Sequence, residues 1–367
     1  MSIFATMKHN DSNPNISPLL TGDECRSLKG LAIVCIILHN FCHRLPGAVF
    51  ENEFTFNPDG IHRLWDLLYS HPSLCVMNLF SFFGHYGVPI FVFCTGYGLV
   101  QKYELRPVAV PVGRFLLSHY VKLVKLLLPA FAICIGVIFY YTGHSITSWS
   151  NFILQTTLLI NFHPDAADII KPGPYWYFGF VMQLYVIYRL LIYHRHWLWM
   201  VVLVAGCWII QVIQQPDGTI LEWIRYNFFM GTLPLVLGII ASRLVWQCTF
   251  SRLQWLTFGT LALMTLALSN LHFHTWLWCH VWVILAAIGV IKSCGKYLSR
   301  MLAWMGALSP FVFVLHPVAR TFTIYRAFNH QPYMWLVVYL LLSFAFAWAF
   351  SYLWSKISAI RHQPCSN

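Results

Sequence analysis

Residues 29–43 read KGLAIVCIILHNFCH, and this stretch decides the fold class. Every residue between Lys29 and His39 is apolar or glycine, which is typical of a helix that crosses a membrane. At a rise of about 1.5 Å per residue, His39 lies roughly 15 Å along the helix from Lys29. If Lys29 marks the inner surface, His39 is expected near the middle of a core about 30 Å thick. Polar side chains at that depth usually face a cavity or the interior of a helix bundle.

Apolar stretches of this kind recur along the whole chain. The protein has 367 residues, of which 58% are hydrophobic and 10% are charged, whereas soluble domains carry roughly a quarter charged residues. We therefore predict an all-α polytopic membrane protein with no separate soluble domain. About ten spanning helices are expected, at residues 28–44, 74–100, 120–142, 175–194, 197–214, 226–244, 254–272, 275–293, 301–324 and 333–355. The apolar segment 151–162 is too short to span, and we expect it to lie in the interface or to re-enter the membrane.

The distribution of basic residues predicts how these helices are oriented. With the N-terminus inside, 17 of the 23 Lys and Arg residues fall on the cytoplasmic side, where membrane proteins concentrate them. Both termini are therefore expected in the cytoplasm, and the net charge of +11 requires no nucleic-acid partner. We predict a disordered cytoplasmic tail over 1–25, without a signal peptide, a membrane domain over 26–356 and a second cytoplasmic tail over 357–367.

The cysteines do not form a recognisable framework. Eleven of them are scattered along the chain with no C-x-x-C pair, so we expect them to act mostly as small apolar side chains in helices. Cys42 and Cys75 bracket one predicted external loop, so a disulfide between these two residues stays open.

The most informative polar group is the cluster at the end of the first helix. His39 and His43 are four residues apart and share one face, with Asn40 about 100° around the helix. Four roles are open for His39: a structural hydrogen bond, a metal ligand, a proton relay for transport, or a general base. A metal site is disfavoured because no matching cluster of Cys, His or carboxylate residues follows. A general base is favoured because imidazole accepts protons near neutral pH.

Several other polar and aromatic positions each allow two interpretations. The basic residues around the start of the third predicted helix either anchor it at the inner surface or hold the phosphates of a cytosolic ligand. His85 and His316 lie inside predicted spans, so each is either structural or part of a pocket. The aromatic residues at helix ends form either an interfacial belt or a platform on which sugar rings stack.

Five segments together resemble the acyltransferase 3 family of bacterial membrane enzymes. They are Lys29 to His39, GVPIFVFCTGY at 87–97, the basic pair Lys122 and Lys125 before Pro129, YWYF at 175–178, and LSPFVFVLHP at 308–317. The resemblance covers roughly residues 24–356. It implies a ten-helix domain in the plasma (inner) membrane that takes an acyl group, usually acetyl, from cytosolic acyl-CoA. The acyl group is then delivered to a hydroxyl of a cell-surface polysaccharide or glycolipid.

The resemblance matches the motif positions Lys29, His39, Lys122 and Lys125, and together with the residue analysis it leads to a hypothesis in which His39 is the general base. The candidates for catalytic support are Asn40, His43, His85 and Tyr97. Those for binding acyl-CoA are Arg26, Lys29, Lys122, Lys125 and Arg114, and those for binding the acceptor are Tyr175, Trp176, Asp165 and His316. We expect acyl-CoA as donor, a surface glycan or lipid-linked saccharide as acceptor and membrane lipid around the helices, with no bound cofactor, metal or nucleic acid. The alternative is an exporter of surface polysaccharide on the same scaffold, without acyl transfer.

Overall fold

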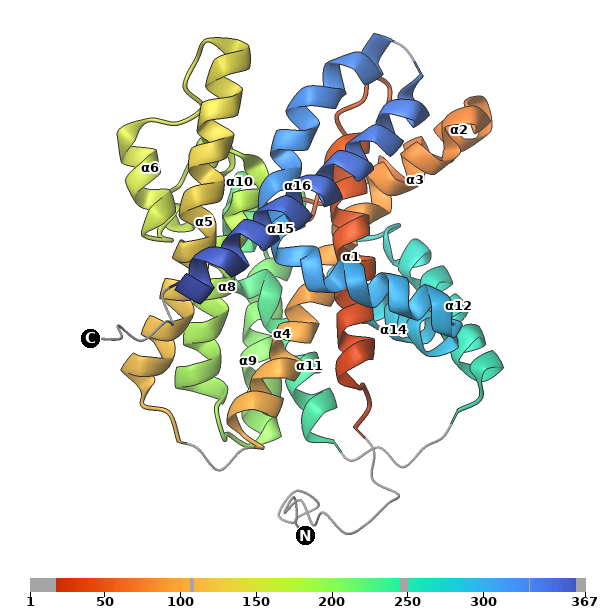
Figure 1. The fold of residues 1–367 in the computed structure, drawn as a ribbon. Helices are drawn as coiled ribbons and strands as arrows, with labels where there is room; N and C mark the ends of the chain where they lie inside the picture. The colour runs from red at the N-terminus through yellow and green to blue at the C-terminus, as the bar shows by residue number, and fades with distance from the viewer. Residues whose placement is uncertain (1–17, 106–108, 245–249, 330, 361–367) are drawn as a thin grey trace, which may run out of the picture.

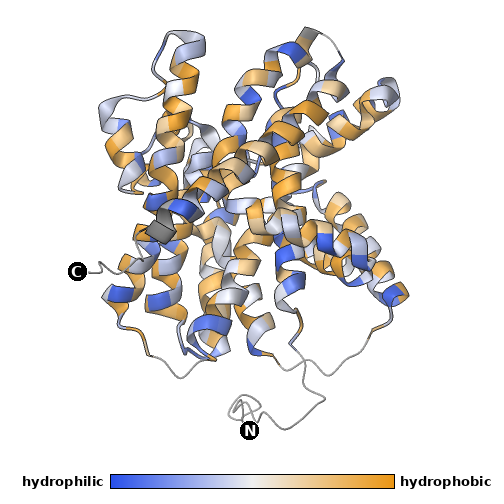
Figure 2. Ribbon diagram, in the orientation of Figure 1, coloured by the Kyte–Doolittle hydropathy of each residue, from blue (hydrophilic) through white to orange (hydrophobic). Residues whose placement is uncertain are grey.

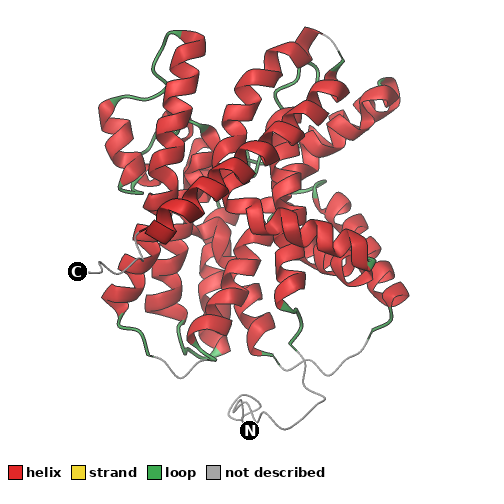
Figure 3. Ribbon diagram, viewed as in Figure 1, coloured by secondary structure: helices red, strands yellow, loops and turns green. Residues whose placement is uncertain are grey.

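The computed structural model describes residues 18–105, 109–244, 250–329 and 331–360 (Figure 1). Within these ranges the chain consists of helices and loops with no strand, as Figure 3 shows, which confirms the all-α prediction. The α-helices are α1 (Gly22–Cys42), α2 (Gly60–Ser70), α3 (Cys75–Phe83), α4 (Gly87–Tyr103), α5 (Val112–Thr142), α6 (Trp149–Thr156), α7 (Ala166–Ile169), α8 (Trp176–Ile187), α9 (Trp197–Val212), α10 (Thr219–Arg225), α11 (Phe228–Arg243), α12 (Arg252–Ser269), α13 (Phe273–Trp276), α14 (Cys279–Ser293), α15 (Lys296–Asn329) and α16 (Pro332–Ile360). Five short helical turns complete them: η1 (Pro72–Leu74), η2 (Gly84–Tyr86), η3 (Ile160–Phe162), η4 (Gly173–Tyr175) and η5 (Tyr188–Ile192).

Six of these helical segments are long and apolar enough to cross a membrane, which confirms a polytopic membrane protein. They are Gly22–Cys42, Pro72–Tyr103, Val112–Thr142, Gly173–Ile192, Lys296–Phe328 and Pro332–Lys356. A seventh span results if α10 and α11, which meet at a bend of 41°, are taken as one. Each of the ten predicted segments is helical, but α9 and α14 have only 16 and 15 residues. Because crossing the core takes about 20 residues, six or seven spans meet the requirement of length and composition, rather than ten.

The ends of the helical region differ from the predicted boundaries. α1 begins at Gly22, inside the predicted N-terminal tail, because Thr21 and Glu24 form a capping box. α16 continues to Ile360, beyond the predicted start of the C-terminal tail. The remaining parts of both predicted tails, 1–17 and 361–367, lie outside the described residues. The segment 151–162 contains most of α6 and the turn η3, both too short to span, in agreement with the prediction.

Glycines allow the central helices to pack backbone against backbone. α1 packs most extensively against α15, and also against α4 and α3. A Cβ at Gly30 of α1 would collide with the carbonyl oxygen of Leu302, and one at Gly306 of α15 with that of Arg26. Gly96 and Gly238 bring α4 and α11 together in the same way. Small residues of this kind are typical of contacts between membrane helices.

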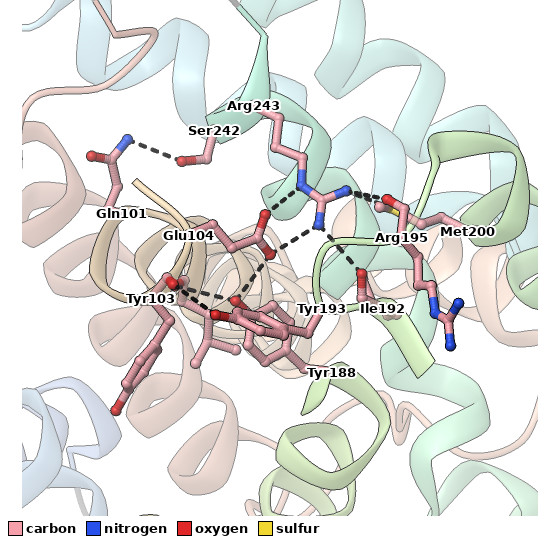
Figure 4. Close-up of polar contacts among 11 residues, drawn as sticks. Gln101, Tyr103, Glu104, Tyr188, Ile192, Tyr193, Arg195, Met200, Ser242 and Arg243 are labelled. Carbon is pink, nitrogen blue, oxygen red and sulfur yellow. Dashed lines mark hydrogen bonds and ion pairs between the residues drawn. The ribbon is translucent and has the colours of Figure 1, made fainter. Parts of the chain in front are cut away.

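Polar contacts tie the C-terminal ends of α4 and α11 together. Figure 4 shows the Arg243 guanidinium paired with both carboxylate oxygens of Glu104, at 2.8 and 2.9 Å. The Tyr188 hydroxyl also donates to Glu104, and Gln101 donates to Ser242. In Figure 2 many hydrophilic residues lie toward helix ends and loops, whereas hydrophobic residues cover most of the helices between them. The predicted orientation places the Glu104–Arg243 pair on the cytoplasmic side, opposite the site described next.

Candidate active site

A cavity of about 200 Å³, here called the chamber, lies at the C-terminal end of α1. Its walls come from α1, the loop that follows it, η2, α4, the region around η4, and α10. The polar residues that line the chamber are His39, Asn40, His43, Arg44, Glu51, Asn52, Glu53, His85 and Glu222, and the aromatic residues are Phe50, Phe54, Trp176, Tyr177, Tyr226 and Phe313. The chamber therefore combines hydrogen-bonding groups with flat apolar surfaces.

His39 is held in one orientation by the backbone of α3. Its Nδ1 lies 2.9 Å from the carbonyl oxygen of Ser81. A carbonyl oxygen can only accept, so Nδ1 carries the hydrogen and Nε2 carries the lone pair. This is the tautomer that a general base requires. His39 lies in the last turn of α1.

Of the four residues predicted to support catalysis, His43 and His85 contact the His39 ring and Asn40 lines the chamber beside it. The ring of His43 stacks on that of His39 at 4.6 Å, and its Nδ1 donates to the His39 carbonyl oxygen at 2.6 Å. The ring of His85 meets that of His39 edge-on at 5.3 Å. Asn40 also lines the chamber, and its side-chain oxygen accepts a hydrogen bond from Arg320.

Tyr97, the fourth predicted supporting residue, does not reach the chamber. It is buried on α4, where its hydroxyl donates to the Leu20 carbonyl oxygen at 3.0 Å and accepts from the Leu20 amide at 3.1 Å. Both bonds fasten α4 to the segment that precedes α1. This contact joins residues 77 positions apart, so no local sequence pattern could predict it.

The predicted acceptor-binding residues are divided among three environments. Trp176 lines the chamber and packs edge-on against Phe54 at 5.1 Å. Tyr175 and His316 are fully buried behind it, with the Tyr175 hydroxyl donating to the Val314 carbonyl oxygen at 2.7 Å. Asp165 lines a neighbouring groove of about 470 Å³ that shares lining residues with the chamber. Of the four predicted acceptor-binding residues, only Trp176 therefore lines the chamber itself.

The five cations predicted to bind acyl-CoA lie away from the chamber on two helices. Arg26 and Lys29 are near the start of α1, where Arg26 is exposed and pairs with Asp23. The other three, Arg114, Lys122 and Lys125, are exposed on α5. α5 packs mainly against α15 and α8, whereas α1 packs mainly against α15, α4 and α3. None of the five cations lines the chamber.

The loop after α1 brings two carboxylates into the chamber that were not among the predicted site residues. Glu51 is buried, with one carboxyl oxygen that has no hydrogen-bond partner among the described residues. Burial raises the pKa of Glu51 to about 8. Burial also raises the pKa of Glu53 to about 7, although the charge of Arg225 opposes this shift. Both groups are therefore protonated for much of the time near neutral pH, and a neutral carboxyl can donate to a sugar hydroxyl as well as accept from one.

The raised pKa of Glu51 predicts how stability depends on pH. The folded protein holds this proton more tightly than the unfolded chain, in which the pKa of Glu is about 4.3. Ionisation of Glu51 therefore reduces stability progressively as the pH rises from about 4 to about 8. We expect Glu51→Gln to remove this loss, so that its Tm in detergent exceeds that of the wild type by a margin that grows between pH 5 and pH 8.5. Asp66→Asn, at an exposed carboxylate, is the control, and a Tm difference for Glu51→Gln that does not vary with pH would contradict the expectation.

Together, the fold and the chamber define a helical membrane protein with a histidine site inside its bundle. The model of the acyltransferase 3 family, described as an acyltransferase domain, matches residues 26–352. Because this match covers nearly the whole chain, the protein belongs to the acyltransferase 3 family and is a membrane acyltransferase. A search of curated proteins and a search of solved structures returned no significant match.

Proposed function

We propose that the protein is an O-acyltransferase of the plasma (inner) membrane that uses cytosolic acyl-CoA. It transfers the acyl group, acetyl in its simplest form, to a hydroxyl of a cell-surface polysaccharide or glycolipid. The observation that carries this proposal is the Nδ1 hydrogen bond of His39 to Ser81, which leaves the lone pair on Nε2 of a residue that lines the chamber. Family membership supports the acyl transfer, and the chamber supports the place where it occurs.

His39 acts as the general base of this transfer. Nε2 takes the proton of the acceptor hydroxyl as the hydroxyl oxygen attacks the carbonyl carbon of the thioester. When the tetrahedral intermediate collapses, the C–S bond breaks and the departing thiolate takes the proton back from His39. The new ester and the free thiol of CoA are the products. A positioned base of this kind accelerates a reaction by about 10²–10⁴-fold.

The aromatic residues of the chamber suit a saccharide acceptor. Phe54 stacks on Tyr226 at 3.9 Å and meets Trp176 edge-on, so the three rings form one continuous apolar surface. The apolar face of a sugar ring packs well on such a surface. The carboxyl groups of Glu51 and Glu53, together with Asn52, supply donors and acceptors for its hydroxyls. Mass spectrometry of surface glycans from cells with and without the protein tests this proposal, and we expect an acyl ester that depends on the protein.

The cations of α1 and α5 are proposed to hold the phosphates of acyl-CoA at the cytoplasmic side. Lys122 and Lys125 are three residues apart on one helix and both are exposed, so their ammonium groups are free to contact phosphates. We expect the double variant Lys122→Ala, Lys125→Ala to raise the KM for acyl-CoA about tenfold or more, with a smaller effect on kcat. Kinetics at varied acyl-CoA concentration measure both constants.

A matched control separates this effect from a general loss of positive charge. Lys356 is also an exposed cation in the region predicted to face the cytoplasm, but it lies on α16. Lys356→Ala should leave the KM for acyl-CoA unchanged. An equal KM for the double variant and the wild type would remove α5 from the donor site.

A further inference from the structure

A second cavity adjoins the chamber beside His85. It has a volume of about 10 Å³ and shares Glu53, His85 and Val88 with the lining of the chamber. We call this cavity the inner slot. A space of this size holds about one water-sized group, and therefore one oxygen atom of a substrate.

Two glycines that flank His85 allow its backbone to pack in direct contact with the backbone of α1. A Cβ at Gly84 would lie 2.6 Å from the Cys35 carbonyl oxygen and 2.7 Å from the Cβ of His39. A Cβ at Gly87 would lie 2.5 Å from the Ala32 carbonyl oxygen. Because no other residue fits at these two positions without displacing α1, the turn η2 holds the His85 ring at the level of His39.

The side chain of His85 has hydrogen-bonding capacity that the described residues do not use. It is only 2% exposed, and neither ring nitrogen makes a hydrogen bond of standard geometry among those residues, although the Phe82 backbone makes a weaker polar contact with the ring. A neutral imidazole always carries one N–H donor, and a buried donor without a full hydrogen bond destabilises the folded protein. An oxygen atom of a bound substrate beside His85 would accept this N–H.

Arg225 places a positive charge in the lining of the inner slot. Arg225 is 2% exposed and lines the slot together with His280. Its guanidinium donates to the Glu53 carbonyl oxygen and to the side-chain oxygen of Gln211, both at 2.7 Å, and lies 4.2 Å from the Trp276 ring centre. The atoms that accept these hydrogen bonds are neutral, and the Glu53 carboxyl that lines the slot is the acidic group that Arg225 influences. While Glu53 is protonated, the charge of Arg225 can stabilise negative charge that develops in the slot.

We propose that the inner slot is the oxyanion site of the acyl transfer, with His85 as the hydrogen-bond donor and Arg225 as the source of positive potential. This inference rests on the proposed function. The carbonyl oxygen of the thioester enters the slot and accepts the N–H of His85. As the acceptor oxygen bonds to the carbonyl carbon, the π electron pair moves onto this oxygen, and the pair returns when the C–S bond breaks. Charge thus develops on the side of the carbonyl carbon where His85 and Arg225 lie, while His39 handles the proton.

Two substitutions at His85 separate hydrogen bonding from packing. His85→Phe keeps a flat ring but removes both nitrogens, whereas His85→Gln keeps an N–H donor in a different shape. The probe is radiolabelled acetyl-CoA added to membranes that contain each variant, with the label counted in the extracted glycans. We expect the kcat of His85→Phe to be about 10²–10³-fold lower than that of the wild type. The kcat of His85→Gln should be at least tenfold higher than that of His85→Phe. The KM for acetyl-CoA should change by less than about threefold in both variants.

Controls distinguish a loss of the oxyanion role from misfolding and from a failure of the proposed function. His119→Phe makes the same substitution at another buried histidine, on α5, which bonds to Tyr103 away from the chamber, and it should transfer label like the wild type. Each variant is also checked for monodisperse elution in detergent. If the folded His85→Phe variant is as active as His85→Gln or more active, the oxyanion assignment is overturned. If wild-type membranes transfer no label at all, the proposed function fails instead.

Discussion

Replacing His39 with alanine should lower the rate of acyl transfer by about 10²–10⁴-fold or more while the protein stays folded. The reason is specific to one atom, because the Ser81 carbonyl oxygen holds the Nδ1 hydrogen and leaves Nε2 as the proton acceptor. Removing the side chain deletes that acceptor and leaves the rest of the chamber in place. Transfer is measured with purified protein, labelled acetyl-CoA and extracted surface glycan.

Two further measurements show whether the loss is chemical. Binding of acetyl-CoA should be unchanged in His39→Ala, because the proposed phosphate contacts lie near the start of α1 and on α5 rather than at the chamber. The variant should also elute and melt like the wild type. Transfer retained within tenfold of the wild type would show that another group accepts the proton.

The variant Gly30→Ala should lose about 3 kcal/mol or more of stability, a large effect for a single methyl group. A Cβ at Gly30 would overlap the Leu302 carbonyl oxygen, and neither backbone can move without separating α1 from α15. Since α1 carries His39, separation of these helices would also disturb the chamber. Unfolding in a titration with denaturing detergent measures the loss.

A second glycine provides the control for this prediction. Gly98 lies inside α4, and a Cβ there would meet no atom within 4 Å. Gly98→Ala should therefore be neutral or stabilise the protein by up to about 1 kcal/mol, because alanine favours the helix more than glycine does. If Gly30→Ala proves as stable as Gly98→Ala, the close contact between α1 and α15 is not needed for the fold.

The sequence was sufficient to predict the features that depend on local pattern. The apolar stretch from Lys29 to His39 predicted α1, and the spacing of four between His39 and His43 predicted that these two side chains lie together, as they do. The family was also predictable, because its motifs are continuous short segments in a fixed order. Hydropathy marked all ten apolar segments as helical, but it measures the length of a segment less reliably, so α9 and α14 are shorter than the predicted spans.

The rest of the site depends on contacts between distant segments. In the sequence, Glu51 and Glu53 cannot be distinguished from ordinary carboxylates of an exposed loop. They line the chamber only because the loop folds over the end of α1. Tyr175 and Trp176 are adjacent in sequence, yet one is buried behind the chamber and the other lines it. The sequence does contain one usable indication, because Glu51 and Glu53 lie between Phe50 and Phe54 in the loop that follows the helix carrying His39.

The central claim is that the protein moves an acyl group onto a glycan, rather than moving the glycan alone. Purified protein in liposomes, supplied with labelled acetyl-CoA on one side and extracted surface glycan on the other, tests this claim most directly. We predict that label appears in the glycan as an ester, with one CoA thiol released for each ester formed, and that His39→Ala abolishes both. Passage of unlabelled glycan across the bilayer without any consumption of acetyl-CoA would contradict the account and would favour an exporter.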